Sequence, residues 1–175
     1  MFRKAPLPQG VSGRLYLHSM PGRFENWDDF ASEADKQGLD AVASLVPYPE
    51  ISEKSPAYAA TLSGGGLSWQ HNSFPISDFG VPPAGDTVAF RAFIAGLAGR
   101  LRQGESVLVH CGAGIGRTGT AAICLLVELG MPLAEAIEVI DRAGSRPESG
   151  TQWEFVRIFG GENGPAVESR SGPEE

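Results

Sequence analysis

Short apolar runs alternate with helix-like patterns along most of the chain. The apolar runs predict strands at residues 14–18, 41–46, 67–74 and 106–110. Between them, apolar residues recur about every 3.6 positions, which is typical of amphipathic helices. Strands that alternate with helices in one chain favour a parallel sheet covered by helices. The sequence therefore predicts an α/β fold with a central, largely parallel sheet of about four to five strands flanked by helices.

Polar residues and glycines mark the ends of the predicted helices. Asn26 can cap a helix that Gly38 would close, and Asp86 can cap a longer one that Gly104 would end. Residues 120–129 are apolar nearly all round, which predicts a helix buried at the centre of the domain. Two further helices are predicted around residues 133–140 and 153–159.

The two ends of the chain differ from its middle. Residues 1–12 predict an extended arm because Pro6, Pro8 and Gly10 interrupt them. Residues 160–175 are rich in Gly, Pro and acidic residues and predict a disordered tail. The 175 residues suit a single domain, so we expect one folded domain over residues 13–159.

Charge and cysteine content restrict the partners and the compartment. The formal net charge of −7 disfavours nucleic acid and anionic membranes as partners. No apolar run is long enough to span a bilayer, and the first residues lack the apolar stretch of a signal peptide. With only two cysteines the chain is no disulfide scaffold. A cytoplasmic protein is expected.

The segment with the strongest chemical signal is residues 106–120, SVLVHCGAGIGRTGT. A strand, a glycine-rich loop and a helix N-terminus in succession form an anion site, because backbone N–H groups converge there. Cys111 stands at the rim of this loop, where such surroundings favour the thiolate over the thiol. Arg117 adds a planar fork that suits two phosphoryl oxygens. The loop thus combines a nucleophile with a phosphate site.

An alternative interpretation of the same loop is a dinucleotide site. Gly114, Gly116 and Gly119 fit the spacing G-x-G-x-x-G between a strand and a helix. That motif requires an acidic residue at the end of a following strand. Here a second helix follows instead, and the motif gives no role to Cys111. The nucleotide interpretation is therefore the weaker one.

The residues from His110 to Thr118 resemble the H-C-x5-R-[ST] signature of the cysteine-dependent protein tyrosine phosphatase superfamily. The small size is similar to that of its dual-specificity branch. The resemblance implies a phosphocysteine intermediate, phosphoprotein substrates, no metal and no cofactor. It also implies that Thr118 supports the departing thiolate. The phosphate would be bound by Gly112, Ala113, Gly114, Ile115, Gly116 and Arg117.

Two other segments resemble loops of this superfamily. Residues 74–82, FPISDFGVP, resemble the loop that carries the general acid, with Asp78 in the matching place. A carboxylic acid there can protonate the leaving oxygen. Asp78 can also be a plain turn residue, and the rival Asp86 is better explained as a helix cap. Residues 145–152 resemble a loop whose glutamine, here Gln152, positions the hydrolytic water.

Two further classes of protein remain open. A rhodanese-like sulfurtransferase also uses a cysteine in an anion-binding loop, but it needs neither Asp78 nor Arg117 followed by Thr118. A phosphoprotein-binding module without activity would lack Cys111, Arg117 or Asp78, and all three are present.

Cys124 is interpreted as a core residue. His110 is expected to orient the loop through a backbone hydrogen bond.

Overall fold

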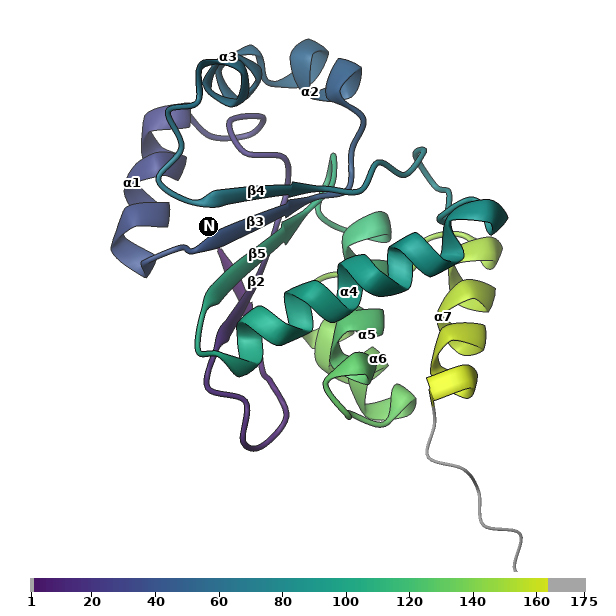
Figure 1. The fold of residues 1–175 in the computed structure, drawn as a ribbon. Helices are drawn as coiled ribbons and strands as arrows, with labels where there is room; N and C mark the ends of the chain where they lie inside the picture. The colour runs from purple at the N-terminus through teal and green to yellow at the C-terminus, as the bar shows by residue number, and fades with distance from the viewer. Residues whose placement is uncertain (1, 164–175) are drawn as a thin grey trace, which may run out of the picture.

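The computed structural model describes residues 2–163, which form one five-stranded sheet between two layers of helices (Figure 1). The strand order is β1-β2-β5-β3-β4. β1 is antiparallel to β2, and the other neighbours are parallel. This arrangement confirms the predicted α/β class. The strands are β1 (Arg3–Ala5), β2 (Arg14–His18), β3 (Ala41–Ser44), β4 (Gln70–Ser73) and β5 (Ser106–His110).

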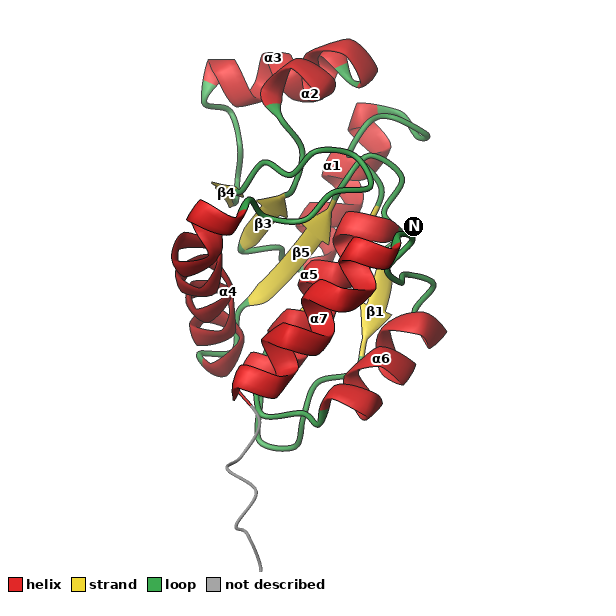
Figure 2. Ribbon diagram, turned by 90° about the vertical axis from the view of Figure 1, so that its right-hand side faces the viewer, coloured by secondary structure: helices red, strands yellow, loops and turns green. Residues whose placement is uncertain are grey.

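Helices cover both faces of the sheet because successive side chains of a strand point to opposite faces. Val107 and Val109 of β5 belong to the larger core, which α4, α5, α6 and α7 cover (Figures 1 and 2). Leu108 faces the smaller core, where it meets Phe30 of α1. The helices are α1 (Trp27–Gln37), α2 (Tyr48–Lys54), α3 (Pro56–Gly64), α4 (Thr87–Arg102), α5 (Gly116–Glu128), α6 (Leu133–Arg142) and α7 (Gly150–Asn163).

The carboxyl ends of four parallel strands lie along one edge of the sheet. The segments that leave this edge are residues 19–26 after β2, the entry to α2 after β3, residues 74–83 after β4, and residues 111–115 after β5. In open α/β sheets, ligands bind outside this edge. The central strand β5 leads directly into α5, whose residues from Gly116 to Val127 are all buried. The fold thus brings four separate segments around one loop.

The structure corrects several expectations about the ends of elements. The expected arm contains β1, since Arg3–Ala5 pairs with β2. α7 runs on to Asn163, past the expected boundary at Gly160, because Gly160 packs closely against Leu133. The rest of the predicted disordered tail, residues 164–175, lies outside the described residues. The predicted strands 41–46 and 67–74 are shorter, at Ala41–Ser44 and Gln70–Ser73.

Two helices were not predicted, and two predicted caps do not form. α2 and α3 lie together above the carboxyl ends of β3 and β4 (Figure 1). Pro49 and Pro56 in their first turns were the available signal. Asn26 and Asp86 precede α1 and α4 as expected, but neither side chain makes a capping hydrogen bond. None of the helices in residues 2–163 is long and apolar enough to cross a membrane.

Candidate active site

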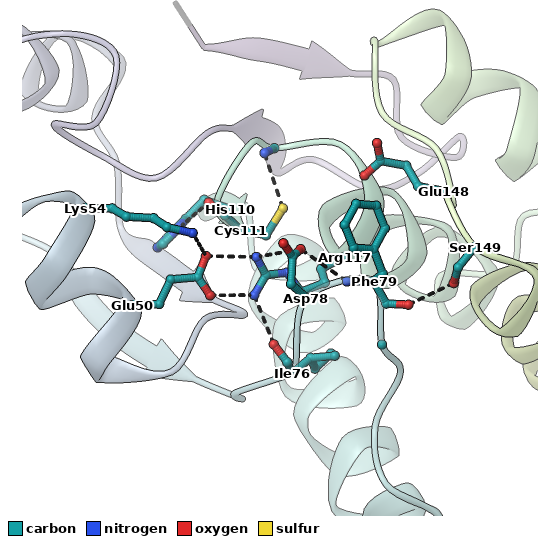
Figure 3. Close-up of polar contacts among 12 residues, drawn as sticks. Glu50, Lys54, Ile76, Asp78, Phe79, His110, Cys111, Arg117, Glu148 and Ser149 are labelled. Atoms are coloured by element: carbon teal, nitrogen blue, oxygen red, sulfur yellow. Dashed lines mark hydrogen bonds and ion pairs between the residues drawn. The ribbon is translucent and has the colours of Figure 1, made fainter.

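Cys111 follows β5 directly and begins the loop that leads into α5 (Figure 3). Its side chain is buried, and its Sγ accepts a hydrogen bond from the backbone N–H of Gly114 at 3.2 Å. Gly114 has a φ of +76°, and a Cβ on it would lie 2.4 Å from the carbonyl oxygen of His18. Only glycine fits there, because the left-handed conformation and the close contact both exclude a side chain. The loop therefore turns an N–H group toward the thiol.

The carbonyl groups of this loop are bound by residues outside it. The N–H of Met20 donates to Gly112 O at 3.2 Å, and Ser145 Oγ donates to Gly114 O at 2.6 Å. Ile115 O accepts from the N–H of Arg146 at 3.3 Å. A peptide whose carbonyl is held outward turns its N–H inward. The surrounding segments thus hold the loop in the shape that an anion site requires.

Arg117 lies in the first turn of α5, and its guanidinium is almost entirely buried (Figure 3). Its Nη1 and Nη2 donate to the two carboxylate oxygens of Glu50 at 2.9 and 3.0 Å. Nη1 also donates to the carbonyl oxygen of Ile76 at 3.0 Å. Burial works to lower the pKa of Arg117, but the interactions with Glu50, Cys111 and Asp78 outweigh burial, so the pKa is raised. Arg117 is therefore a fixed, permanently charged fork.

Glu50 of α2 is a site residue that the sequence did not reveal. It lies 67 positions before Arg117, and no pattern in residues 47–66 marked it. It also accepts a hydrogen bond from Lys54 Nζ at 3.1 Å. Burial works to raise the pKa of Glu50, but Arg117 and Lys54 outweigh it, so the pKa is lowered. The carboxylate stays ionised and holds Arg117 through a bidentate salt bridge.

Asp78 reaches the same arginine from the loop after β4 (Figure 3). Its Oδ1 lies 3.2 Å from Arg117 Nη2, while its side chain remains 63% exposed. The N–H of Phe79 donates to Oδ1 at 3.1 Å. Phe79 has a φ of 56°, a conformation that costs about 1–2 kcal/mol for a residue with a side chain. Such strain is stored where the surrounding contacts impose it, and it often occurs at functional sites.

The segment before α7 holds the Asp78 loop in place. Ser149 Oγ donates to Phe79 O at 2.8 Å. Gln152 is fully buried, and its Nε2 donates to Gly80 O at 3.0 Å while its Oε1 accepts from the N–H of Glu148 at 2.8 Å. From the sequence we expected this glutamine to position the hydrolytic water. In this conformation, both ends of its amide bind backbone groups of the two loops.

Two further residues of the motif, His110 and Thr118, are polar and buried. Thr118 Oγ1 is buried without a hydrogen-bond partner among residues 2–163. His110 Nδ1 lies 3.3 Å from Cys111 O, and its Nε2 lies 3.2 Å from the hydroxyl of Tyr58. Burial lowers the pKa of His110 to about 3, so the ring is neutral at pH 7. A neutral ring that donates through Nδ1 and accepts through Nε2 satisfies both contacts, which matches the expected orienting role.

Arg23 is a second nearby residue that the sequence did not single out. It lies between β2 and α1, and its guanidinium stacks on the ring of Phe24 at 4.6 Å. A Cβ on Gly112 would lie 3.1 Å from both Arg23 Nη1 and Arg117 Nη2. Arg23 Nη1 and Arg117 Nη2 therefore both border the same glycine of the loop. A cation thus stands at the rim of the loop, although the loop itself contributes only Arg117.

The groups around the Cys111 loop decide which chemistry the arrangement allows. Within the described part of the chain, no three His, Cys, Asp or Glu side chains gather in a way that could hold a metal ion. The groups that the structure does bring together are a thiol, an arginine, a loop of backbone N–H groups and a carboxylate. Asp78, and not Asp86, is the aspartate that contacts Arg117. These groups suit the binding of a phosphoryl group next to a nucleophile.

Solved structures of phosphatases share this fold. A kinase associated phosphatase with serine in place of its catalytic-site cysteine superposes with a TM-score of 0.78 at 20% identity, over 93% of this chain and 95% of that one. Tk-PTP in its active form gives a TM-score of 0.65 at 25% identity, over 91% and 97%. A human tyrosine phosphatase-like serine/threonine/tyrosine-interacting protein gives 0.66 at 18% identity, over 91% and 96%.

A family model adds sequence-level support to this likeness. The model described as "Swiss Army Knife protein, DSP-PTPase phosphatase domain" matches residues 19–157. The match includes the Asp78 loop, the Cys111 loop and Gln152, and it covers most of the 175-residue chain. The chain therefore belongs to this family of dual-specificity-type protein phosphatase domains within the protein tyrosine phosphatase superfamily.

Proposed function

We propose that the protein hydrolyses phosphotyrosine on proteins, together with phosphoserine and phosphothreonine if the pocket admits them, through a phosphocysteine intermediate. The observation that carries the proposal is the meeting of three groups, two from the loop and helix that follow β5 and one from the loop after β4. Cys111 Sγ lies in the N–H loop, Arg117 is gripped beside it, and Asp78 lies 3.2 Å from Arg117. The three groups correspond to a nucleophile, a clamp for the phosphoryl oxygens and an acid for the leaving group.

In the first step, the Cys111 thiolate attacks phosphorus and forms an S–P bond while the bond from phosphorus to the leaving oxygen breaks. Asp78 gives its proton to that oxygen, so the product leaves as a neutral alcohol or phenol. Arg117 and the N–H groups from Gly112 to Gly116, including those of Ala113 and Ile115, bind the equatorial oxygens. Charge is thereby stabilised by groups that are already in place.

In the second step, water attacks phosphorus and the S–P bond breaks. Asp78, now a carboxylate, takes the proton of the water, and inorganic phosphate leaves. The hydroxyl of Thr118 donates a hydrogen bond to the departing thiolate, a role that suits its unpartnered buried oxygen. For Gln152 we propose a positioning role in place of water binding, because its amide joins Gly80 to Glu148.

The residues of the loop itself support a phosphoprotein substrate. The variable positions Gly112, Ala113 and Ile115 add no cation that would favour a multiply charged head group. Phe79, next to Asp78, is 58% exposed and can lie against an aromatic leaving group. We therefore expect phosphotyrosyl peptides to be hydrolysed with a higher kcat/KM than soluble inositol phosphates. Comparable values for the two substrates would contradict this assignment.

The covalent intermediate is the step to test. We expect turnover of p-nitrophenyl phosphate in the presence of a chelator. Rapid acid quenching with a ³²P-labelled phosphotyrosyl peptide should leave label on Cys111. Cys111→Ser should lose both turnover and label, while it still binds vanadate, because the loop and Arg117 hold the anion. Cys124→Ser is the matched control and should keep both. Substantial turnover by Cys111→Ser would overturn the mechanism.

A further inference from the structure

The carbonyl oxygen of Gly114 has a second donor besides Ser145, and it comes from the N-terminal strand. Arg3 Nη2 donates to Gly114 O at 2.5 Å, across 111 positions of the sequence. The N–H of the same residue, Gly114, points to Cys111 Sγ. Arg3 thus binds the peptide unit next to the one that faces the proposed nucleophile.

The other end of the guanidinium is bound just as firmly. Arg3 Nη1 donates to Ala143 O at 3.1 Å and also to Gly144 O. Gly144 has a φ of +79°, and a Cβ on it would lie 3.0 Å from Arg3 Nη1. Arg3 therefore bridges the end of α6 and the Cys111 loop with a planar fork, which only arginine can offer.

The strand that carries Arg3 is itself fixed to the sheet. Arg3 pairs with Leu17 in the register of β1 and β2. Phe2, the preceding residue, packs its ring against Tyr16, His18 and Phe30 at centroid distances of 5.5, 5.2 and 5.4 Å. The neighbour of Arg3 is thus anchored in the smaller core while Arg3 reaches the loop. The edge strand β1 therefore does more than extend the sheet, because it also fixes the position of Arg3.

The charge of Arg3 also acts on the site. Burial lowers the pKa of Arg3, and the nearby Cys111 thiol acts in the opposite direction. The charge of Arg3 therefore lies close enough to Cys111 for the two groups to interact. The hydrogen bonds of Arg3 go to carbonyl oxygens of the loop and of the end of α6. Its influence therefore passes through the loop.

We propose that Arg3 is a positioning residue of the Cys111 loop, which makes strand β1 part of the catalytic machinery. This inference rests on the proposed phosphatase function. Arg3 holds the Gly114 carbonyl outward, so that the neighbouring N–H groups stay directed at the thiolate and the phosphoryl group. Without it, Ser145 alone would hold that carbonyl. The loop could then turn a carbonyl inward, which would repel both anions.

The test compares Arg3→Gln and Arg3→Lys with Lys4→Gln. Lys4 is the next residue of β1, is exposed, and makes none of these hydrogen bonds. Two readouts are measured on folded protein, as checked by circular dichroism. One is the pH profile of Cys111 alkylation by iodoacetamide, followed by mass spectrometry. The other is kcat/KM on p-nitrophenyl phosphate.

For Arg3→Gln we expect alkylation to need a higher pH and kcat/KM to fall about 10- to 100-fold, as for a small displacement of reacting groups. Arg3→Lys should recover only part of the loss, because lysine lacks the fork. Lys4→Gln should match the wild type. If Arg3→Gln lowers stability but leaves both readouts equal to those of Lys4→Gln, the proposal is wrong.

Two outcomes keep this inference separate from the function itself. Alkylation needs no phosphatase activity. A shifted alkylation profile in a protein that hydrolyses no phosphoester would support the positioning role and refute the proposed function. If Arg3→Gln does not fold, Ser145→Ala removes the other donor to Gly114 and leaves β1 intact. An alkylation profile unchanged in that variant would count against the idea that the carbonyl contacts set the loop.

Discussion

The two cysteines of the chain are almost equally buried, yet they occupy opposite environments. Cys111 is 2% exposed and Cys124 is fully buried. The sulfur of Cys111 accepts an N–H from Gly114 and lies within reach of the charge of Arg117. Cys124 lies in the middle of α5, where burial strongly raises the pKa of its thiol. Two thiols of nearly equal burial thus differ in the hydrogen-bond donors and charges around them, which are the features that favour a reactive thiol.

Among the residues around Cys111, loss of the Arg117 guanidinium should lower kcat/KM the most. For Arg117→Lys we expect kcat/KM on a phosphotyrosyl peptide to fall about 10³–10⁵-fold, the range known for arginines that stabilise phosphoryl transfer. Lysine keeps the charge but cannot bind Glu50 and two phosphoryl oxygens in fixed geometry. Arg102→Lys is the control, because Arg102 donates to Glu128 O at the far end of α4. A largely retained kcat/KM would refute the bidentate argument.

The next largest effect concerns the proton for the leaving group. Asp78→Asn should lower kcat on tyrosyl phosphate about 10²–10⁴-fold and flatten the basic limb of the pH–kcat profile. The loss should shrink on a substrate with a good leaving group, which hardly needs the proton. Asp86→Asn should match the wild type in all three measurements, because Asp86 precedes α4 and makes no capping hydrogen bond. The reverse pattern would show that the acid is misassigned.

Glu50 acts one step further from the sulfur, so its loss should cost less. Glu50→Gln keeps the size of the side chain but loses the charge that grips Arg117. We expect kcat/KM to fall by up to about 10²-fold, the cost of a displacement of reacting groups by about 1 Å. An unchanged kcat/KM would mean that α5 alone orients the arginine.

The pair of Glu50 and Arg117 also predicts a pH dependence of stability. The pKa of Glu50 is lowered in the folded protein, so the pair stabilises the fold above the ordinary value of 4.5. That contribution is lost as the pH falls through the lowered value. The difference in free energy of unfolding between the wild type and Glu50→Gln should therefore shrink below about pH 4.5 in urea titrations. A constant difference across this range would contradict it.

The smallest effect on activity should come from Cys124. Cys124→Ala should leave kcat/KM within about a factor of two, because a substitution in the apolar core of α5 leaves the site groups in place. It should lower the free energy of unfolding by about 1 kcal/mol, as loss of core packing does. In the native wild type, iodoacetamide should modify Cys111 only. Equal modification of both thiols would break the contrast between them.

The sequence predicted the parts of the site whose residues are close together in the chain. The strand, loop and helix from Ser106 to Thr120 are contiguous, so spacing alone indicated an anion site with Cys111 and Arg117. Two of the predicted strands, β2 and β5, have the expected ends. Glu50 and Arg3 were missed because they meet the loop only through tertiary packing, 67 and 111 positions from their partners.

The hydrogen-bond partners of several polar side chains could not be predicted from the sequence. Gln152 resembled a water-binding residue, but the fold places it between two loops whose backbone groups take both ends of its amide. Asn26 and Asp86 stand at helix starts without bonding there, and Asn26 Nδ2 instead lies 3.5 Å from Asp29 Oδ2. Chain position was predictable in these cases, and side-chain partners were not. The partners come from segments that are distant in the chain, and a local sequence pattern does not show which of these segments will meet.

The place of Cys124 in α5 has a consequence for oxidation. It stands eight positions beyond Gly116, about 12 Å along the helix from the loop. A disulfide requires Cα atoms within about 7 Å, so we do not expect Cys124 to resolve a sulfenic acid on Cys111. The chain has no other cysteine. We therefore predict that recovery of Cys111 from peroxide needs an added thiol such as glutathione, and that its rate rises with the concentration of that thiol.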